Sequence, residues 1–106
     1  MEKIERVDTV LKGNDPDRPP VSLWYHFGLQ HLGGAAIARA SLEFFEHYDF
    51  DFLKVMNDYF YPAPEGLEAV RGPADLRRFQ RFKPADTIWS EQFQALEMIR
   101  TALKNR

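Results

Sequence analysis

The chain has 106 residues, 44 % of them hydrophobic and 28 % charged, which is the balance of a folded polypeptide rather than a disordered one. Its net charge of −2 excludes the basic footprint expected of a nucleic-acid-binding or membrane-surface protein. The absence of cysteine excludes disulfides and cysteine-ligated zinc within this sequence, and no apolar run approaches the roughly 18 residues that span a bilayer. The first residues lack the apolar core of a signal peptide, so we expect a cytoplasmic protein.

The first predicted element is a short amphipathic helix at the N-terminus. Gly13 and Pro16 mark its end, and the punctuated loop 13–20 follows, in which two adjacent prolines resist both helix and sheet. The helix is predicted from four apolar residues that share one helical stripe: Ile4, Val7, Val10 and Leu11.

Two short apolar runs with a helical stretch between them predict a parallel pair of strands. Residues 21–25 and 50–56 have the length and composition of strands that are buried on both faces. Residues 35–48 carry apolar side chains at helical spacing. Because strands alternate with helices, the pattern indicates the α/β class.

The remainder of the chain is predicted to be a long loop followed by helix. Residues 59–73 contain three prolines and two glycines, and Pro73 is placed to open a short helix. A last helix is expected over residues 87–102, with a stripe that packs against the sheet. That stripe repeats at helical spacing and consists of Trp89, Phe93, Leu96, Ile99 and Leu103.

Two motifs give the sequence a resemblance to a known family. One is the turn Asp-Arg-Pro-Pro-Val at residues 17–21, which follows a short charged helix. The other is the run 48–58, Tyr-Asp-Phe-Asp-Phe-Leu-Lys-Val-Met-Asn-Asp, which ends in Asp58. Together they resemble the start of the uroporphyrinogen decarboxylase superfamily, whose members are (β/α)₈ barrels.

The resemblance implies a partial barrel, because a complete (β/α)₈ barrel takes about 250 residues. We therefore expect residues 1–106 to be the N-terminal segment of such a TIM-barrel domain, in the order helix, strand, helix, strand, helix. We also expect this segment to be inactive alone. A two-stranded arrangement is marginal in water, where three or more strands are usually needed.

The resemblance implies a lyase, a decarboxylase of porphyrin biosynthesis that acts on a tetrapyrrole, with Asp58 as its catalytic carboxylate. Decarboxylation of such a substrate passes through a protonated, positively charged pyrrole. A fixed carboxylate in a dry pocket stabilises that charge better than water does. The alternative interpretation is that Asp58 is a turn residue, since Asn-Asp pairs are common in turns.

The loop after the first predicted strand departs from the decarboxylases of this family. Where the family carries two substrate-binding arginines, this sequence has Tyr25 and Leu29, which bear no charge. The loop offers His26 and His31 instead, five positions apart and so not spaced as a helical metal pair. We predict that Tyr25, His26, His31 and Tyr59 contact a small-molecule substrate; two ordinary loop histidines are the alternative.

The altered loop leaves a second chemistry open, that of the corrinoid- or coenzyme M-linked methyltransferases of the same superfamily. The zinc ligands of those enzymes lie later in the chain, so zinc or corrinoid is expected only in a full-length relative. This segment is predicted to hold no metal and no cofactor.

A third interpretation is a small, non-enzymatic binding module that assembles from identical copies. An incomplete sheet would leave apolar surface exposed, and such surface drives association. We therefore expect a homo-oligomer, with neither nucleic acid nor membrane as a partner. For the enzyme interpretation we expect His26 and Asp58 to lie at the same end of the two strands.

Overall fold

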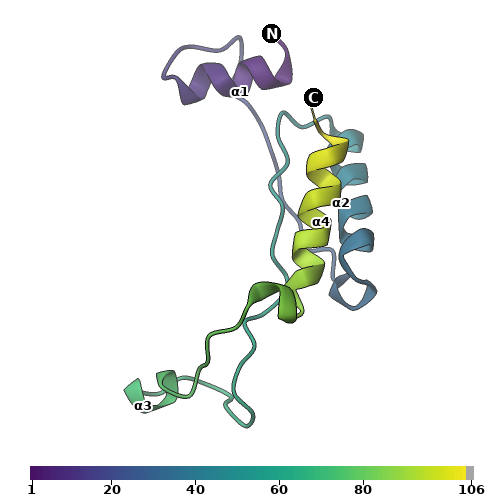
Figure 1. Ribbon diagram of the computed structural model, residues 1–106. Helices are drawn as coiled ribbons and strands as arrows, with labels where there is room; N and C mark the ends of the chain where they lie inside the picture. The colour runs from purple at the N-terminus through teal and green to yellow at the C-terminus, as the bar shows by residue number, and fades with distance from the viewer. Residues whose placement is uncertain (105–106) are drawn as a thin grey trace.

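All regular structure in residues 1–104, the part of the chain that the structure describes, is helical. The structure is a computed structural model, and the chain is drawn in Figure 1. In order, its elements are α1 (Lys3–Leu11), the 3₁₀ turn η1 (Gln30–Leu32), α2 (Gly34–Tyr48), α3 (Pro73–Leu76), the 3₁₀ turn η2 (Pro84–Asp86) and α4 (Trp89–Ala102).

The predicted α/β class is wrong, and so is the partial (β/α)₈ TIM-barrel segment. Residues 21–25 and 50–56 are extended, but neither is a strand, and no strand is present anywhere in residues 1–104. A strand needs a regular ladder of backbone hydrogen bonds. Within the described residues one such bond joins the two segments, from the N–H of Asp51 to the carbonyl of Val21 at 2.9 Å.

The two extended segments nevertheless run side by side in the same direction, as Figure 1 shows. Val21 lies beside Asp51, and the Lys54 ammonium lies 5.2 Å from the ring centroid of Trp24. In both contacts the two residues are thirty positions apart in the sequence. The two segments therefore keep the same register from Val21 to Trp24. Helix α2 provides the connection that returns the chain to its starting end.

Helices α2 and α4 pack against each other through small residues and form most of the core. Ala38 and Ala95 are completely buried, with Ile37 and Ile99 nearly so. The helices approach so closely at Gly34 that an added Cβ would lie 2.1 Å from the carbonyl oxygen of Glu91. Only glycine fits this contact, and backbone proximity on this scale fixes the pairing of the two helices.

The buried face of α4 differs from the predicted stripe. Ile99 is buried as expected, but its buried partners are Gln92 and Ala95. Phe93 and Leu96, which were predicted to pack against a sheet, are 49 % and 41 % exposed. Because no sheet forms, these side chains have no layer to cover.

Helix α1 is held to the rest of the chain by a network of charges. Arg6 is 7 % exposed and binds Asp17 at 2.7 Å and Asp51 at 2.5 Å. Arg18 binds the second oxygen of Asp51 at 2.6 Å. The Asp-Arg-Pro-Pro-Val motif therefore joins α1 to the start of both extended segments. The predicted helix 35–48 and the short helix at Pro73 are confirmed.

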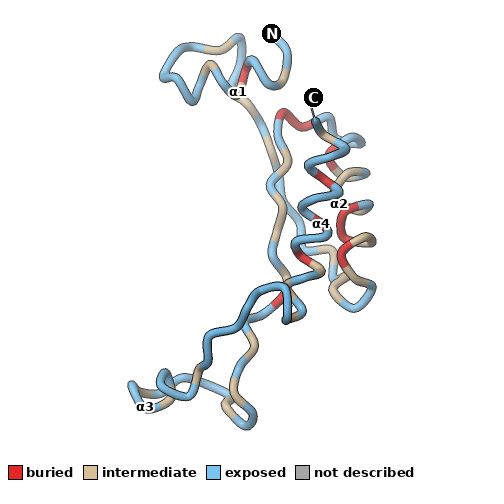
Figure 2. Tube along the Cα trace, in the orientation of Figure 1, coloured by how far each residue is buried: buried red, intermediate tan, exposed pale blue. Residues whose placement is uncertain are grey.

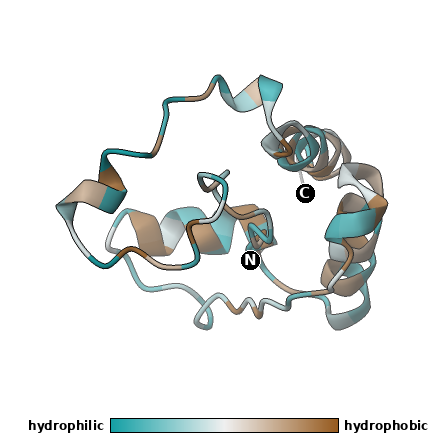
Figure 3. Ribbon diagram, turned by 90° about the horizontal axis from the view of Figure 1, so that it is seen from below, coloured by the Kyte–Doolittle hydropathy of each residue, from teal (hydrophilic) through white to brown (hydrophobic). Residues whose placement is uncertain are grey.

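The molecule is elongated, with extents of 52 × 31 × 21 Å and a radius of gyration of 17.8 Å. A compact domain of this length has a radius of gyration of about 13 Å. Buried residues gather on the facing sides of α2 and α4 and where the extended segments begin, while the arm that carries α3 is largely exposed (Figure 2). Figure 3 shows hydrophobic residues on the helices and on the irregular stretches alike. Much apolar surface is therefore uncovered.

Candidate functional site

The side chains of His26 and Asp58 meet where the two extended segments end. Nδ1 of His26 contacts Oδ1 of Asp58 in a short, direct interaction. The two residues come from different segments, and the parallel register places them at the same end of each. The two residues lie at the same end, as expected, but of two extended segments rather than two strands, and their direct contact was not predicted. Their role as site residues stays a prediction.

Burial differs sharply between the two members of this pair. The Asp58 side chain is 12 % exposed, whereas the His26 side chain is 54 % exposed. A largely buried carboxylate on Nδ1 holds the imidazole in one orientation and selects the tautomer that donates from Nδ1. Nε2 of His26 is then left as an acceptor on the open side. This is the arrangement in which a histidine can take up or deliver a proton.

An aromatic residue and a cation border the pair. The ring of Trp24 meets that of His26 edge to face, with the centroids 5.3 Å apart. Lys54 lies over the same Trp24 ring, at 5.2 Å from its centroid, and is stabilised there by the negative face of the indole. Trp24 therefore has the Lys54 ammonium and the His26 ring as neighbours.

The cavity beside the pair is small. Its volume is about 10 Å³, which is room for one water molecule. Its walls come from both extended segments and from α2: Trp24, Tyr25, Phe27, Ile37, Ser41, Phe44, Leu53, Lys54, Met56 and Asp58. A ligand larger than water must therefore bind outside this cavity, and the exposed His26 side chain, which does not line it, is the accessible member of the pair.

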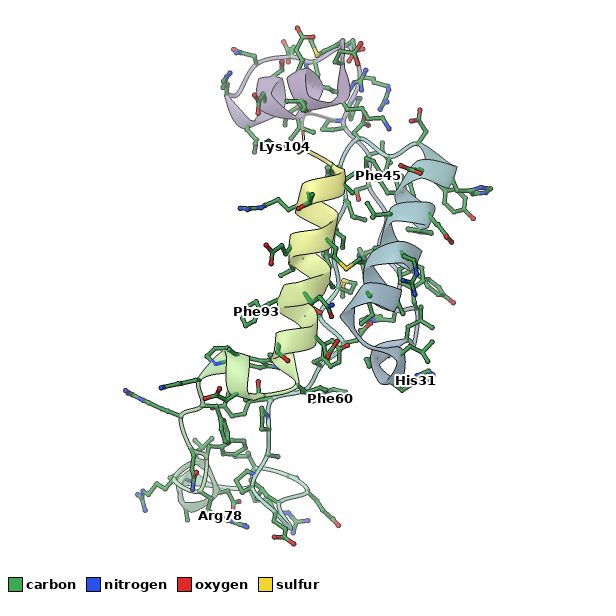
Figure 4. The ribbon with its side chains drawn as sticks, turned by 45° about the vertical axis from the view of Figure 1, so that its right-hand side comes forward. His31, Phe45, Phe60, Arg78, Phe93 and Lys104 are labelled. Carbon is green, nitrogen blue, oxygen red and sulfur yellow. The ribbon has the colours of Figure 1, made fainter. Side chains whose placement is uncertain are left out.

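Two of the other predicted site residues, Tyr25 and His31, differ in their relation to this pair. Tyr25 is 61 % exposed, lines the cavity and packs its ring against Phe27 and Phe44. His31 lies in η1, at the turn that precedes α2 (Figure 4), and is exposed. Among the described residues it makes no contact with His26 or Asp58.

Tyr59 is buried in the core instead of facing the cavity. Its side chain is 6 % exposed, and its hydroxyl donates to the carbonyl of Gln30 at 3.3 Å. Its own carbonyl accepts from the indole N–H of Trp89 at 3.2 Å. Burial raises the pKa of the Tyr59 hydroxyl, and the charges of Glu91 and Asp58 raise it further. Its hydroxyl is thus engaged within the protein.

Sequence reasoning missed Lys54 and Ser41 as neighbours of the site. Lys54 lies within the predicted strand 50–56 and Ser41 within the predicted helix 35–48, and neither was predicted to lie near a site. Both line the cavity that Asp58 borders. The register that brings Lys54 to Trp24 could have been found only by pairing the two segments, which no local pattern specifies.

No protein-family model, no curated protein and no solved structure matches the chain. The resemblance to the uroporphyrinogen decarboxylase superfamily therefore stays a prediction. Residues 1–104 contain no group of three or more His, Cys, Asp or Glu side chains placed to bind one metal ion. None of the helices in that part of the chain is long and apolar enough to span a membrane.

Proposed function

We propose that the chain carries the acid–base pair of a lyase-type enzyme, with decarboxylation of a pyrrole-bearing substrate as its reaction. The observation that carries the proposal is the contact of Asp58 with Nδ1 of His26, which leaves Nε2 of that ring open. Support for the reaction type comes from the sequence motifs at residues 17–21 and 48–58. No similarity to a known protein supports the reaction type.

The roles of the two residues follow from their burial. Asp58 is the largely buried partner, and its negative charge stabilises the imidazolium form of His26 when the ring carries a second proton, on Nε2. His26, which is exposed, is the group that meets the substrate. Asp58 acts through His26 as a positioning residue in this arrangement.

The proposed step is a loss of CO₂ from an acetate group on a pyrrole. His26 delivers a proton from Nε2 to a carbon of the pyrrole ring, which makes the pyrrole positively charged. The bond between the methylene carbon and the carboxylate then breaks, its electron pair forms a double bond from the methylene carbon to the ring and cancels that charge, and the carboxylate leaves as CO₂. The methylene carbon takes up a proton from water and becomes a methyl group, and the ring carbon returns its added proton to Nε2 of His26. General acid catalysis of this kind contributes about 10²–10⁴-fold to a rate.

Lys54 has a defined part in the same proposal. Its ammonium lies over the ring of Trp24, which is a neighbour of His26. Among the residues that line the cavity, Lys54 is the one with a positive charge. A carboxylate of the substrate pairs with this ammonium, while the pyrrole plane lies against the exposed ring of Tyr25. The charge contact orients the substrate toward His26.

Because His26 and Asp58 meet within residues 1–104 and need no sheet to do so, the proposal assigns activity to this chain itself, in place of the expectation that the segment is inactive alone. The test uses the 106-residue chain and a pyrrole that carries an acetate group. Histidine NMR signals are followed as the pyrrole is added, and CO₂ release is measured on the same samples. We expect the His26 signals to shift, those of His47 to stay in place, and CO₂ release to be lost in His26→Gln but not in the matched control His47→Gln. His47 lies on α2, and its ring packs on that of Tyr48. Equal shifts of both histidines, or release that persists in His26→Gln, would contradict the proposal.

A further inference from the structure

The extended segment 52–58 has backbone groups that no other part of the molecule uses. Within the described residues its backbone makes one hydrogen bond, in which the carbonyl of Met56 accepts from the amide of Gln92 at 3.5 Å. The remaining N–H and C=O groups of the segment have no protein partner there. An extended chain with free backbone groups is a template for pairing with a second extended chain.

A groove lies between this segment and the outer side of α4. Its volume is about 340 Å³, and six residues line it: Val55, Asn57, Trp89, Gln92, Phe93 and Leu96. Figure 4 shows Phe93 on the side of α4 that faces away from α2. The groove thus contains the part of the predicted α4 stripe that found no sheet to cover. It is separate from the cavity beside His26, to which Lys54, Met56 and Asp58 contribute instead.

Gln92 lies at the groove and has one amide atom without a partner. The residue is 9 % exposed, and its Oε1 is buried without a hydrogen-bond partner in the described part of the chain. A buried acceptor left unsatisfied is destabilising, and nearly all such groups in native proteins have a partner. Gln92 lines the groove, so a turn of its amide would bring this oxygen to a backbone or side-chain N–H that fills the groove.

The exposed area of the chain exceeds that of a compact monomer. Its accessible surface is 8057 Å². A compact monomer of 12.4 kDa exposes about 6,100 Å², so the excess is about 1,900 Å² per chain. Part of this excess lies on the exposed arm that carries α3, so about 1,900 Å² is an upper bound on what each copy buries through the segment 52–58 and the groove, and an interface of standard size needs about 800 Å² per copy.

We propose that the segment 52–58 pairs antiparallel with the same segment of a second copy, and that the grooves of both copies close on each other. A twofold pairing is self-complementary, because each copy offers the same edge and the same groove. Centred on Val55, it sets Lys54 opposite Met56 and Phe52 opposite Asp58 of the second copy. Like charges therefore do not face each other, which is the condition for a stable cross-strand pairing. This proposal does not depend on the chemistry of His26 and Asp58.

The test is sedimentation of the 106-residue chain over a range of concentrations, with a matched pair of leucine variants. Leu96 lines the groove, whereas Leu76 is exposed on α3 at the far end of the arm. We expect a dimer for the parent chain and for Leu76→Glu, and a dissociation constant raised about tenfold or more for Leu96→Glu. Phe93→Glu, on the same groove, is expected to repeat the effect.

Hydrogen exchange separates loss of the dimer from loss of the fold. In the dimer, the amides of residues 52–58 become protected, and in Leu96→Glu they exchange quickly while those of α2 stay protected. A parent chain that is monomeric at all concentrations, a dimer unchanged by Leu96→Glu, or amides of 52–58 unprotected in the dimer would each overturn the proposal. Larger assemblies that tolerate both groove variants would overturn it as well.

Discussion

Val21 and Asp51 exchange two hydrogen bonds. The N–H of Asp51 donates to the carbonyl of Val21 at 2.9 Å, and the N–H of Val21 donates to the Asp51 carboxylate at 2.8 Å. The same carboxylate binds Arg6 and Arg18. One side chain therefore ties α1, the loop after it and the start of both extended segments together. The register that brings His26 to Asp58 begins at this point.

Replacing Asp51 by Asn is expected to detach α1. The amide keeps the shape of the carboxylate but removes one of the two counter-charges of the buried Arg6 guanidinium, so that Asp17 alone balances it. We expect a melting temperature lower by about 5 °C or more and faster amide exchange in α1. Asp15→Asn is the control, because Asp15 is exposed in the same loop. Equal melting of the two variants would show that the network does not hold α1.

Acid should release α1 in a defined pH window. Hydrogen bonds from Arg18, from the Val21 N–H and from Arg6 lower the pKa of Asp51 to about 2, from an ordinary value of 3.8. The depressed pKa means that the stabilisation is present above pH 3.8 and is lost as the pH falls through about 2. Arg6 likewise holds the pKa of Asp17 well below its usual range. A circular-dichroism titration should therefore show α1 unfolding between about pH 4 and pH 2, and Asp51→Asn should lose most of this dependence.

The contact between α2 and α4 should not tolerate a methyl group at Gly34. A Cβ there would lie 2.1 Å from the Glu91 carbonyl oxygen and 3.1 Å from the Ala95 nitrogen, so the helices must separate. We expect Gly34→Ala to lower the free energy of unfolding by about 1–3 kcal/mol, measured by urea denaturation. Gly72→Ala is the control, because nothing lies within 4 Å of its added Cβ. Two variants of equal stability would mean that the close approach does not matter.

Local patterns in the sequence predicted the helices but could not predict how they are used. The stripe that runs through Phe93 and Leu96 is apolar at helical spacing, and α4 forms as expected. Yet α4 meets α2 through Gln92 and Ala95, because small residues allow the backbones to approach and large ones do not. The helical spacing of apolar residues shows which face of α4 is hydrophobic. The size of the side chains decides which face packs against α2.

The candidate site was predictable in part for a related reason. Asp58 and His26 each follow a short apolar run, and two parallel extended segments joined by a helix bring such positions to the same end. The extended conformation and its direction follow from the sequence. A sheet does not, because a stable sheet usually has three or more paired strands, and in residues 1–104 a single backbone hydrogen bond joins these two segments. The fold class was wrong for that reason.

The Tyr59 hydroxyl should ionise only when the core opens. Burial raises its pKa above the ordinary 10, and the nearby charges of Glu91 and Asp58 add to this effect. A raised pKa of this kind contributes stability below pH 10, and that stability is lost as the pH rises through the folded value. Ultraviolet titration should therefore show one tyrosine that ionises together with alkaline unfolding. Tyr59→Phe, which loses the bond to Gln30, should abolish that step; a tyrosine signal unchanged in Tyr59→Phe would refute the assignment.

The contact between His26 and Asp58 should fix the tautomer of the imidazole. With the carboxylate on Nδ1, the neutral ring carries its proton there, and Nε2 is the bare nitrogen. Nitrogen NMR distinguishes the two ring nitrogens, so the Nδ1–H form should dominate in the parent chain above the titration of the ring. Asp58→Asn offers an amide where the carboxylate stood and should shift the balance toward Nε2–H, the form usual in free histidine. His47, whose ring packs on Tyr48, should be the same in both proteins. A His26 tautomer that does not respond to Asp58→Asn would mean that the carboxylate does not orient the ring, and the acid–base pair would lose its basis.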